Sequence, residues 1–198
     1  MSTMLLSLLA GLGGMLGWGV YDFFAGVYSK TIGPFKTFYW SQLAGLIFII
    51  FIVFVSNLPF HITFSTLLLV MVASLFYSAG YLCFMRGFEI GNISIIAAIN
   101  NLWAVFTMLF AFAFMGQRLT LVQFVGVMMI IFGAILTSVK LNDIKTSKQI
   151  GLSLGVKETI IGTVFFGIFW NISEILSESI GWFSTTLFVK LFIIIIIT

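Results

Sequence analysis

The segment GMLGWGVYDFFAGVYSKTIGPFKTFYWSQLAGLIFI, residues 14–49, aligns without a gap onto residues 162–197 at a constant offset of 148. Ten of the 36 aligned positions carry the same residue, against roughly three expected by chance for so apolar a composition. In the first copy the identical positions are Gly14, Gly19, Ser29, Ile32, Gly33, Phe35, Thr37, Leu43, Ile47 and Ile49. We therefore predict a complete repeat at residues 1–140, a linker at 141–157, and the beginning of a second repeat at 158–198.

The composition of the chain favours lipid as its surroundings. Apolar residues make up 61% of the sequence and charged residues 8%, with a mean hydropathy of +1.22, whereas soluble domains carry about 25% charged residues. A net charge of +3 spread over the loops suits contact with anionic lipid headgroups and gives no indication of nucleic-acid binding. We therefore predict an all-α, polytopic bundle of transmembrane helices in the cell membrane.

Seven apolar stretches are long enough to cross a bilayer, which takes about 20 residues of helix. Turn signals or charged clusters, such as Gly33-Pro34, separate them. The expected spans are residues 4–28, 34–55, 66–87, 93–115, 120–140, 158–178 and 181–197. Five spans precede the linker, so the second repeat must enter the membrane upside down. Such inverted repeats are typical of secondary transporters, whose site lies near the midplane between the repeats.

The positive charges of the loops predict the orientation of the chain. The loops after the first, third and fifth spans hold seven basic residues, whereas the opposite side holds only Arg118. The seven are Lys30, Lys36, Arg86, Lys140, Lys145, Lys148 and Lys157. Because cytoplasmic loops carry the excess of Lys and Arg, the count predicts a cytoplasmic linker and an external N-terminus.

Three groups of residues resemble one known family. They are the stretch Tyr81–Ser94, the segment Leu102–Val105, and Met115–Thr120 followed by Gln123–Gly126. These residues resemble the region from the third to the fifth helix of the EamA-like family of the drug/metabolite transporter superfamily. The resemblance covers the whole first repeat and the first two helices of the second. It implies ten helices in two inverted five-helix repeats, a small organic solute, and cytoplasmic termini, which differs from the charge count.

The chain departs from the family pattern at two positions. Ala104 stands where family members often have proline, and its presence predicts a straight fourth helix, since proline is a common cause of helix kinks. Gln117 stands where they usually have glutamate, which removes a salt-bridge partner for Arg118. We therefore expect hydrogen bonds to hold that turn.

The first span carries a polar face. Trp18, Tyr21 and Asp22 recur at three- and four-residue steps with small residues, so they share one side of a helix. Asp22 is the only acidic residue between Met1 and Arg86. One hypothesis makes Asp22 a cation or proton site in a cavity wall. The other makes it an acid near the helix end that pairs with Lys30 or Lys36 through water.

The second repeat carries further polar residues. Asn171, Glu174 and Glu178 lie along one face of the sixth span. Glu174 is interpreted either as a cation or proton site or as an acid that reaches towards the interface, and the latter is favoured for Glu178. Lys190 lies in the middle of the seventh span, where the repeat alignment places Gln42. A lysine at that depth needs a partner, and Glu174 is the expected one.

The third and fourth spans contribute the remaining candidates. Tyr77 and Tyr81 lie one helical turn apart, and Asn100 and Asn101 are adjacent at mid-depth. The asparagines either bond neighbouring helices or line the site. Because unpaired polar groups are costly in lipid, the candidates should face one central volume. The candidate solute-binding residues are Trp18, Tyr21, Asp22, Tyr77, Tyr81, Asn100, Trp103, Asn171 and Glu174. Aromatic rings beside carboxylates favour a flat or cationic solute.

These features favour secondary transport of a small organic metabolite or drug-like solute by alternating access, with a proton or cation as the coupling ion. The alternatives are a non-transporting membrane scaffold and an inactive fragment of a transporter. The sequence has no phosphate-binding Gly-Lys-Ser run, no paired cysteines and no His-x-x-x-His. We therefore expect no enzyme activity, no cofactor and no metal, and the expected partners are the solute and membrane lipids.

The charge bias generates a labelling prediction. In a chain whose Cys83 is replaced by alanine, Lys145→Cys should react with a membrane-impermeant maleimide only after the cells are permeabilised, because the linker is expected in the cytoplasm. Arg118→Cys in the same background is the matched control and should react in intact cells. Reaction of position 145 in intact cells would overturn the orientation derived from the charge count.

Overall fold

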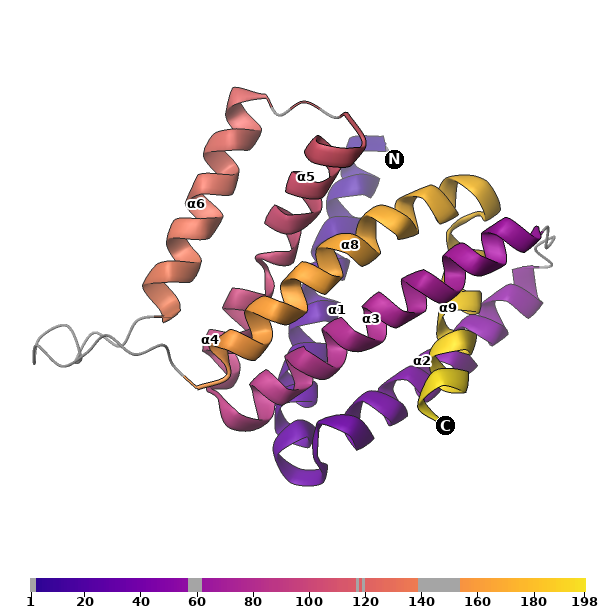
Figure 1. Ribbon diagram of the computed structural model, residues 1–198, viewed down its shortest axis with the longest axis horizontal. Helices are drawn as coiled ribbons and strands as arrows, with labels where there is room; N and C mark the ends of the chain where they lie inside the picture. Colours follow the sequence, from indigo (N-terminus) through magenta and orange to yellow (C-terminus); the bar gives the residue numbers. More distant parts are fainter. Residues whose placement is uncertain (1–2, 57–61, 117, 119, 139–153) are drawn as a thin grey trace, which may run out of the picture.

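The computed structural model describes residues 3–56, 62–116, 118, 120–138 and 154–198, and all of its regular structure is α-helical (Figure 1). Most of the predicted linker therefore lies outside the described residues. The helices are α1 (Thr3–Ile32), α2 (Pro34–Ser56), α3 (Phe64–Ile90), α4 (Ile93–Asn100), α5 (Trp103–Phe114), α6 (Leu121–Ser138), α8 (Val156–Ile180) and α9 (Trp182–Ile197).

The described helices match the expected polytopic bundle. When α4 and α5 are counted as one span, five of the described spans are long and apolar enough to cross a membrane. The apolar segments of α6 and α9 are shorter. The seven expected spans correspond in order to α1, α2, α3, the α4–α5 pair, α6, α8 and α9. The protein is therefore an integral membrane protein built as an all-α bundle.

Glycines at aligned positions end the first helix of each repeat. Gly33 lies between α1 and α2 with φ 88°, and Gly181 lies between α8 and α9 with φ 82°. Only glycine adopts this backbone region without strain. The 148-residue offset thus relates two helix–helix turns that each contain a glycine with a positive φ.

The expectation of a straight fourth helix is wrong, because that span is divided at Asn101 and Leu102. The Leu102 N–H donates to the Ile99 carbonyl (2.9 Å) and the Ala104 N–H donates to the Asn101 carbonyl (3.2 Å), which is a tightened, three-residue bonding pattern. The Asn101 side-chain amide also donates to the Ala97 carbonyl (3.2 Å). An asparagine side chain that competes for backbone carbonyls interrupts a helix without proline.

The turn before α6 lies partly outside the described residues, since Gln117 is not among them. Arg118 is exposed. At the start of α6 the Thr120 N–H donates to Gln123 Oε1 (2.8 Å), and the Gln123 N–H donates back to Thr120 Oγ1 (3.3 Å). This reciprocal pair is a capping box, and it stabilises the first turn of the helix.

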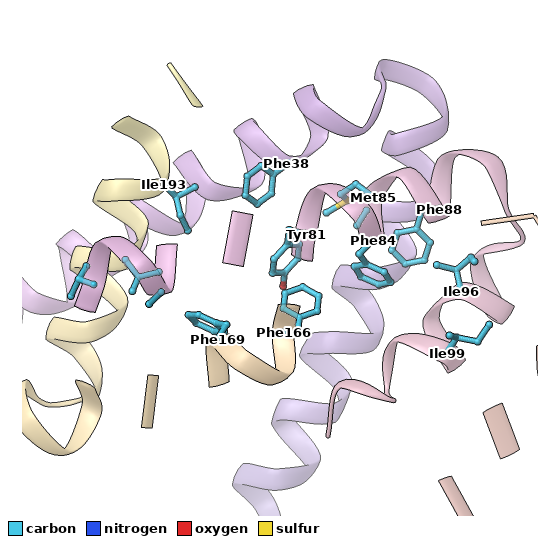
Figure 2. Packing of buried hydrophobic residues seen from close by; sticks show 14 of the residues in the cluster. Phe38, Tyr81, Phe84, Met85, Phe88, Ile96, Ile99, Phe166, Phe169 and Ile193 are labelled. Atoms are coloured by element: carbon cyan, nitrogen blue, oxygen red, sulfur yellow. The ribbon is translucent and has the colours of Figure 1, made fainter. Parts of the chain in front are cut away.

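The centre of the bundle is the crossing of α3 and α8. Two glycines meet there: a methyl group on Gly162 would lie 2.9 Å from the Gly80 carbonyl oxygen, and one on Gly80 would lie 3.2 Å from the Gly162 carbonyl oxygen. The two backbones are therefore in direct contact, as in other small-residue crossings in membranes. A cluster of buried aromatic rings surrounds this crossing, with Tyr81 between Phe38 and Phe166 in Figure 2.

Helices related by the offset run in opposite directions. The last turns of α1 and α3 lie at the same end of the bundle, where Ser29 Oγ donates to Met85 Sδ (3.2 Å). Helix α8 begins at that end, because Gly155 packs against the Gly87 backbone. In Figure 1, α1 descends from the N-terminus whereas α8 ascends from its first residue. These are the directions that an inverted repeat requires.

The first helix has fewer neighbours than its repeat equivalent. Gly162 and Gly167 of α8 pack against α3 and α5, whereas a methyl group added to the aligned Gly14 or Gly19 of α1 would meet nothing within 4 Å. Among the described residues, the glycines of α8 are therefore tightly packed, whereas the aligned glycines of α1 have open space beside them.

This difference predicts the effect of adding one methyl group. Gly162→Ala should lower the free energy of unfolding in detergent by about 1–3 kcal/mol, because its Cβ would collide with the Gly80 backbone. Gly14→Ala is the matched control, and its effect should stay within about 0.5 kcal/mol. Equal losses in both variants would show that α1 is as tightly packed as α8.

Candidate solute-binding cavity

Three cavities between the described helices are candidate sites, and the largest of these three, about 600 Å³, lies between α1, α3, α4, α5 and α8. It contains six of the nine residues proposed from the sequence. These are Trp18, Asp22, Tyr77, Tyr81, Asn100 and Trp103. Residues from the second repeat that complete its wall are Phe166, Phe169 and Trp170. The cavity therefore lies where α8 meets α1, α3, α4 and α5.

Two oxygen atoms of residues that line the cavity have no hydrogen-bond partner in the described part of the chain. Asp22 Oδ1 and Asn100 Oδ1 are buried and accept no hydrogen bond within the described residues. No direct ion pair joins Asp22 to Lys30 or Lys36, since Arg86 and Glu89 form the only ion pair in the described part of the chain. Lys30 is also about 12 Å further along the helix axis, at 1.5 Å per residue. A buried carboxylate without a partner is unfavourable, which favours a cationic ligand or a proton at Asp22.

Seven of the 16 residues that line the cavity are aromatic. The Tyr77 and Tyr81 ring centroids are 4.5 Å apart, and Tyr77 packs edge-on against Phe169 at 4.8 Å. Tyr81 packs edge-on against Phe166 at 4.8 Å, as Figure 2 shows. These close contacts fix the ring orientations. Ring faces and edges of this kind bind flat apolar groups and, at their faces, cations.

A second cavity of about 450 Å³ adjoins the first. Gly14, Trp18, Tyr77 and Tyr81 line both, so the two volumes meet along these residues. The candidate Tyr21 lies in this second cavity rather than in the first. The remaining residues of its wall are Gly17, Ser41, Gln42, Gly45 and Lys190.

The expected pairing of Lys190 with Glu174 is wrong. Lys190 Nζ instead donates to Gln42 Oε1 at 2.9 Å. The physical reason is that α9 packs against α2, where Leu187 joins a cluster with Leu46 and Ile49. Gln42 and Lys190 are also equivalent positions of the repeat alignment, and equivalent positions of a two-fold arrangement meet only at its axis.

Glu174 does not share a cavity with Asp22. It lines a third cavity of about 460 Å³ together with Glu178, Ser177 and Trp182. Trp103 and Trp170, whose centroids are 5.3 Å apart, line both this cavity and the largest one. The two indole rings thus form a partition. The expectation of one volume containing both carboxylates is corrected to two volumes on either side of this tryptophan pair.

Asn171 joins helices rather than lining the largest cavity. Its side-chain amide donates to the Thr107 carbonyl of α5 (3.1 Å) and to the Gly167 carbonyl of its own helix (2.8 Å). Gly167 allows this approach, because a methyl group there would lie 2.6 Å from Phe106 Cβ. The geometry is that of an interhelical hydrogen bond supporting the cavity wall.

Gln42 and Lys190 line the second cavity but are not among the site residues predicted from the sequence. The signal that could have identified them is their alignment at the 148-residue offset, because a polar pair at equivalent positions of an inverted repeat meets where the repeats face each other. The apolar wall residues Phe166 and Phe169 carried no comparable signal, since phenylalanine occurs throughout this chain.

The comparison with protein families agrees with this architecture. The model of the EamA-like transporter family matches residues 5–139, which is most of the chain. No curated protein and no solved structure matches the chain. The family match covers the helices that supply Asp22, Tyr77, Tyr81, Asn100 and Trp103.

The interhelical bond of Asn171 generates a stability prediction. Asn171→Leu should lower the free energy of unfolding by roughly 0.5–1.5 kcal/mol, because the bond to the Thr107 carbonyl is lost while the branched shape of the side chain is kept. Thr186→Val is the control, since the Thr186 hydroxyl bonds only the Trp182 carbonyl one turn back in its own helix. Thermal unfolding in one detergent compares the two. A Thr186→Val loss as large as that of Asn171→Leu would contradict the assigned role.

Proposed function

The chain belongs to the EamA-like transporter family, and on that premise we propose that it moves a small organic solute across the cell membrane by alternating access. Membership of this family identifies the chain as a membrane transporter of small solutes. The proposal adds a solute class and a site: an aromatic or flat solute with a cationic group, bound in the cavity between α1, α3, α4, α5 and α8.

The observation that carries the proposal is the combination of Asp22 with the aromatic wall. Asp22 Oδ1 is buried without a partner in the described part of the chain, in a cavity that also contains Tyr77 and Tyr81. An ammonium group beside Asp22 would neutralise the carboxylate, and ring faces would add cation–π attraction. Asn100 Oδ1 would accept a further N–H of the same group.

The proposed coupling uses the same carboxyl group. A buried carboxyl group is stable when it is neutralised either by a proton or by the cationic solute, and unstable when it is bare. A site that holds one of the two at a time exchanges a proton for a solute. Movement of α8 and α9 against the helices of the first repeat would then open the cavity to one side of the membrane at a time.

A non-transporting scaffold is the second candidate, because the glycine face of α1 meets no neighbour within the described residues. Small residues on an open helix face allow another helix to approach closely. The scaffold requires no flux of solute and no role for Asp22. Measurement of transport therefore separates the two functions.

The proposed function predicts the effect of removing one charge. In proteoliposomes with an imposed pH gradient, 2-phenylethylamine should accumulate, and Asp22→Asn should reduce its initial rate at least about tenfold, since a neutral amide neither attracts the ammonium group nor exchanges a proton. The residual flux of the variant should no longer depend on the pH gradient.

Glu89→Gln is the control for this experiment. Glu89 pairs with Arg86 near the end of α3 and lines none of the three cavities, so its rate should equal that of the wild type. Both variants should be checked for equal incorporation and thermal stability. Wild-type and Asp22→Asn proteins with the same rate would remove Asp22 from the mechanism, and no flux above empty liposomes would favour the scaffold.

A further inference from the structure

The third cavity, of about 460 Å³, lies beside the second half of α8, and the function proposed above makes no use of it. The Trp103–Trp170 pair separates it from the largest cavity. Of the eight residues that line it, three are tryptophans, two are glutamates and three carry a hydroxyl group. This wall therefore combines negative charge, hydrogen-bonding oxygen atoms and aromatic surface.

The two glutamates are arranged so that a cation beside them would be stabilised. Glu174 and Glu178 are four residues apart on α8 and line the same cavity, which places them about 6 Å apart along the helix axis. Like charges at this spacing repel each other. Neither carboxylate forms an ion pair in the described part of the chain, and Lys190 of the following helix bonds Gln42 instead. A bound cation would relieve the repulsion.

Two serine hydroxyls of the same wall have no hydrogen-bond partner among the described residues. Ser177 Oγ is buried without one. Ser173 is only 3% exposed, and its hydroxyl also bonds no described residue, whereas the Thr107 hydroxyl donates to the Trp103 carbonyl (2.9 Å). Each serine directly precedes one of the two glutamates, so the two rows lie side by side along the helix. Because buried polar groups without partners are unfavourable, these oxygen atoms favour a ligand that donates hydrogen bonds.

Three tryptophans complete the wall, each from a different helix. Trp103 begins α5, Trp170 lies in α8 and Trp182 begins α9. The Trp103 and Trp170 centroids are 5.3 Å apart, and the Trp170 and Trp182 rings are parallel within 5° with centroids 6.2 Å apart. Indole has the most favourable ring face for a cation. The rings therefore favour the same ligand charge as the carboxylates.

The cavity lies close to one end of the transmembrane helices. Glu178 is two residues before the last residue of α8, and Trp182 begins α9 directly after the Gly181 turn. Trp182 is 52% exposed, and tryptophan near a helix end is typical of the membrane–water interface. Lipid headgroups lie at that depth, so their ammonium groups are within reach of the cavity.

We propose that this third cavity is a separate binding site for a primary ammonium group, and that the headgroup of phosphatidylethanolamine supplies it. The carboxylates of Glu174 and Glu178 neutralise the charge, and the hydroxyls of Ser173 and Ser177 accept its remaining N–H groups. A quaternary ammonium group would leave these oxygen atoms unpaired. A metal ion is disfavoured because indole rings supply no ligand to it and a hard cation such as calcium takes six to eight oxygen ligands.

Native mass spectrometry of the purified full chain in a non-ionic detergent tests the proposal. The probes are phosphatidylethanolamine, phosphatidylcholine and phosphatidylglycerol with the same acyl chains, so only the headgroup differs. The wild type should bind phosphatidylethanolamine at least about fivefold more tightly than either of the other two lipids, since only its headgroup carries a cation with N–H donors.

Free ethanolamine distinguishes a lipid from a water-soluble source of the same group. Its binding is followed by tryptophan fluorescence in nanodiscs that contain phosphatidylglycerol alone. A preference for phosphatidylethanolamine among the lipids identifies the headgroup as the source. Equal binding of the three lipids, together with saturable ethanolamine binding that requires Glu174 and Glu178, identifies a free amine as the source and still supports the ammonium site.

The variants assign the preference to this cavity. The double variant Glu174→Gln with Glu178→Gln should bind the three lipids with affinities equal within about twofold, because the neutral amides keep the side-chain size and remove the charge. The matched control is Glu89→Gln with Glu158→Gln, which also removes two negative charges. Neither of these residues lines any of the three cavities, so the control should keep the wild-type preference.

Three results would overturn the proposal. They are a wild type that neither prefers phosphatidylethanolamine nor binds ethanolamine, a Glu174 and Glu178 double variant that binds both as the wild type does, and an equal loss in the control variant. The first result needs no variant, so it stands even where the double variant fails to fold. The site does not depend on transport, so a failure of 2-phenylethylamine flux would leave these outcomes unchanged.

Discussion

The contact between the backbones of α3 and α8 at Gly80 and Gly162 is the constraint on which the rest of the bundle depends. Because lipid tails are as apolar as leucine, helices in a membrane associate through close packing and hydrogen bonds rather than through the hydrophobic effect. Two facing glycines allow α3 and α8 to touch along their main chains. That approach brings Phe166 against Tyr81 and Phe169 against Tyr77, so the cavity wall is a consequence of the crossing. The Asn171 bond to the Thr107 carbonyl ties α5 to the same helix and supports the opposite side of the cavity.

Much of the fold could be predicted from hydropathy, because a bilayer imposes one length on every crossing helix and excludes an unpaired backbone. The division of the fourth span at Asn101 could not, since it depends on whether one asparagine side chain bonds water, a neighbouring helix or its own Ala97 carbonyl. The glycines Gly33 and Gly181, which align at the 148-residue offset, both have a positive φ at a turn between two helices.

The candidate site was predictable in part. Helical periodicity identified Trp18, Asp22, Tyr77 and Tyr81, because residues on one face of a helix stay together whatever the packing around them. Which side chains pair between helices was harder to predict from the sequence. Glu174 was expected beside Lys190 from charge alone, whereas Lys190 meets Gln42 because α9 packs on α2. The Trp103–Trp170 pair that divides Asp22 from Glu174 forms between α5 and α8, and its geometry depends on how closely Gly167 allows them to approach.

The bond between Gln42 and Lys190 has an electrical consequence. Residues that occupy equivalent positions of an inverted repeat and touch each other lie at equal depth from the two membrane surfaces. If the two repeats of such a protein exchange conformations, a residue at this position stays at the same depth in the membrane. Moving one elementary charge through the full membrane potential changes its energy by about 2.3 kcal/mol for each 100 mV. A lysine on the axis avoids most of that change, so the voltage would act on the cargo and on Asp22 while leaving the Lys190 charge almost unaffected.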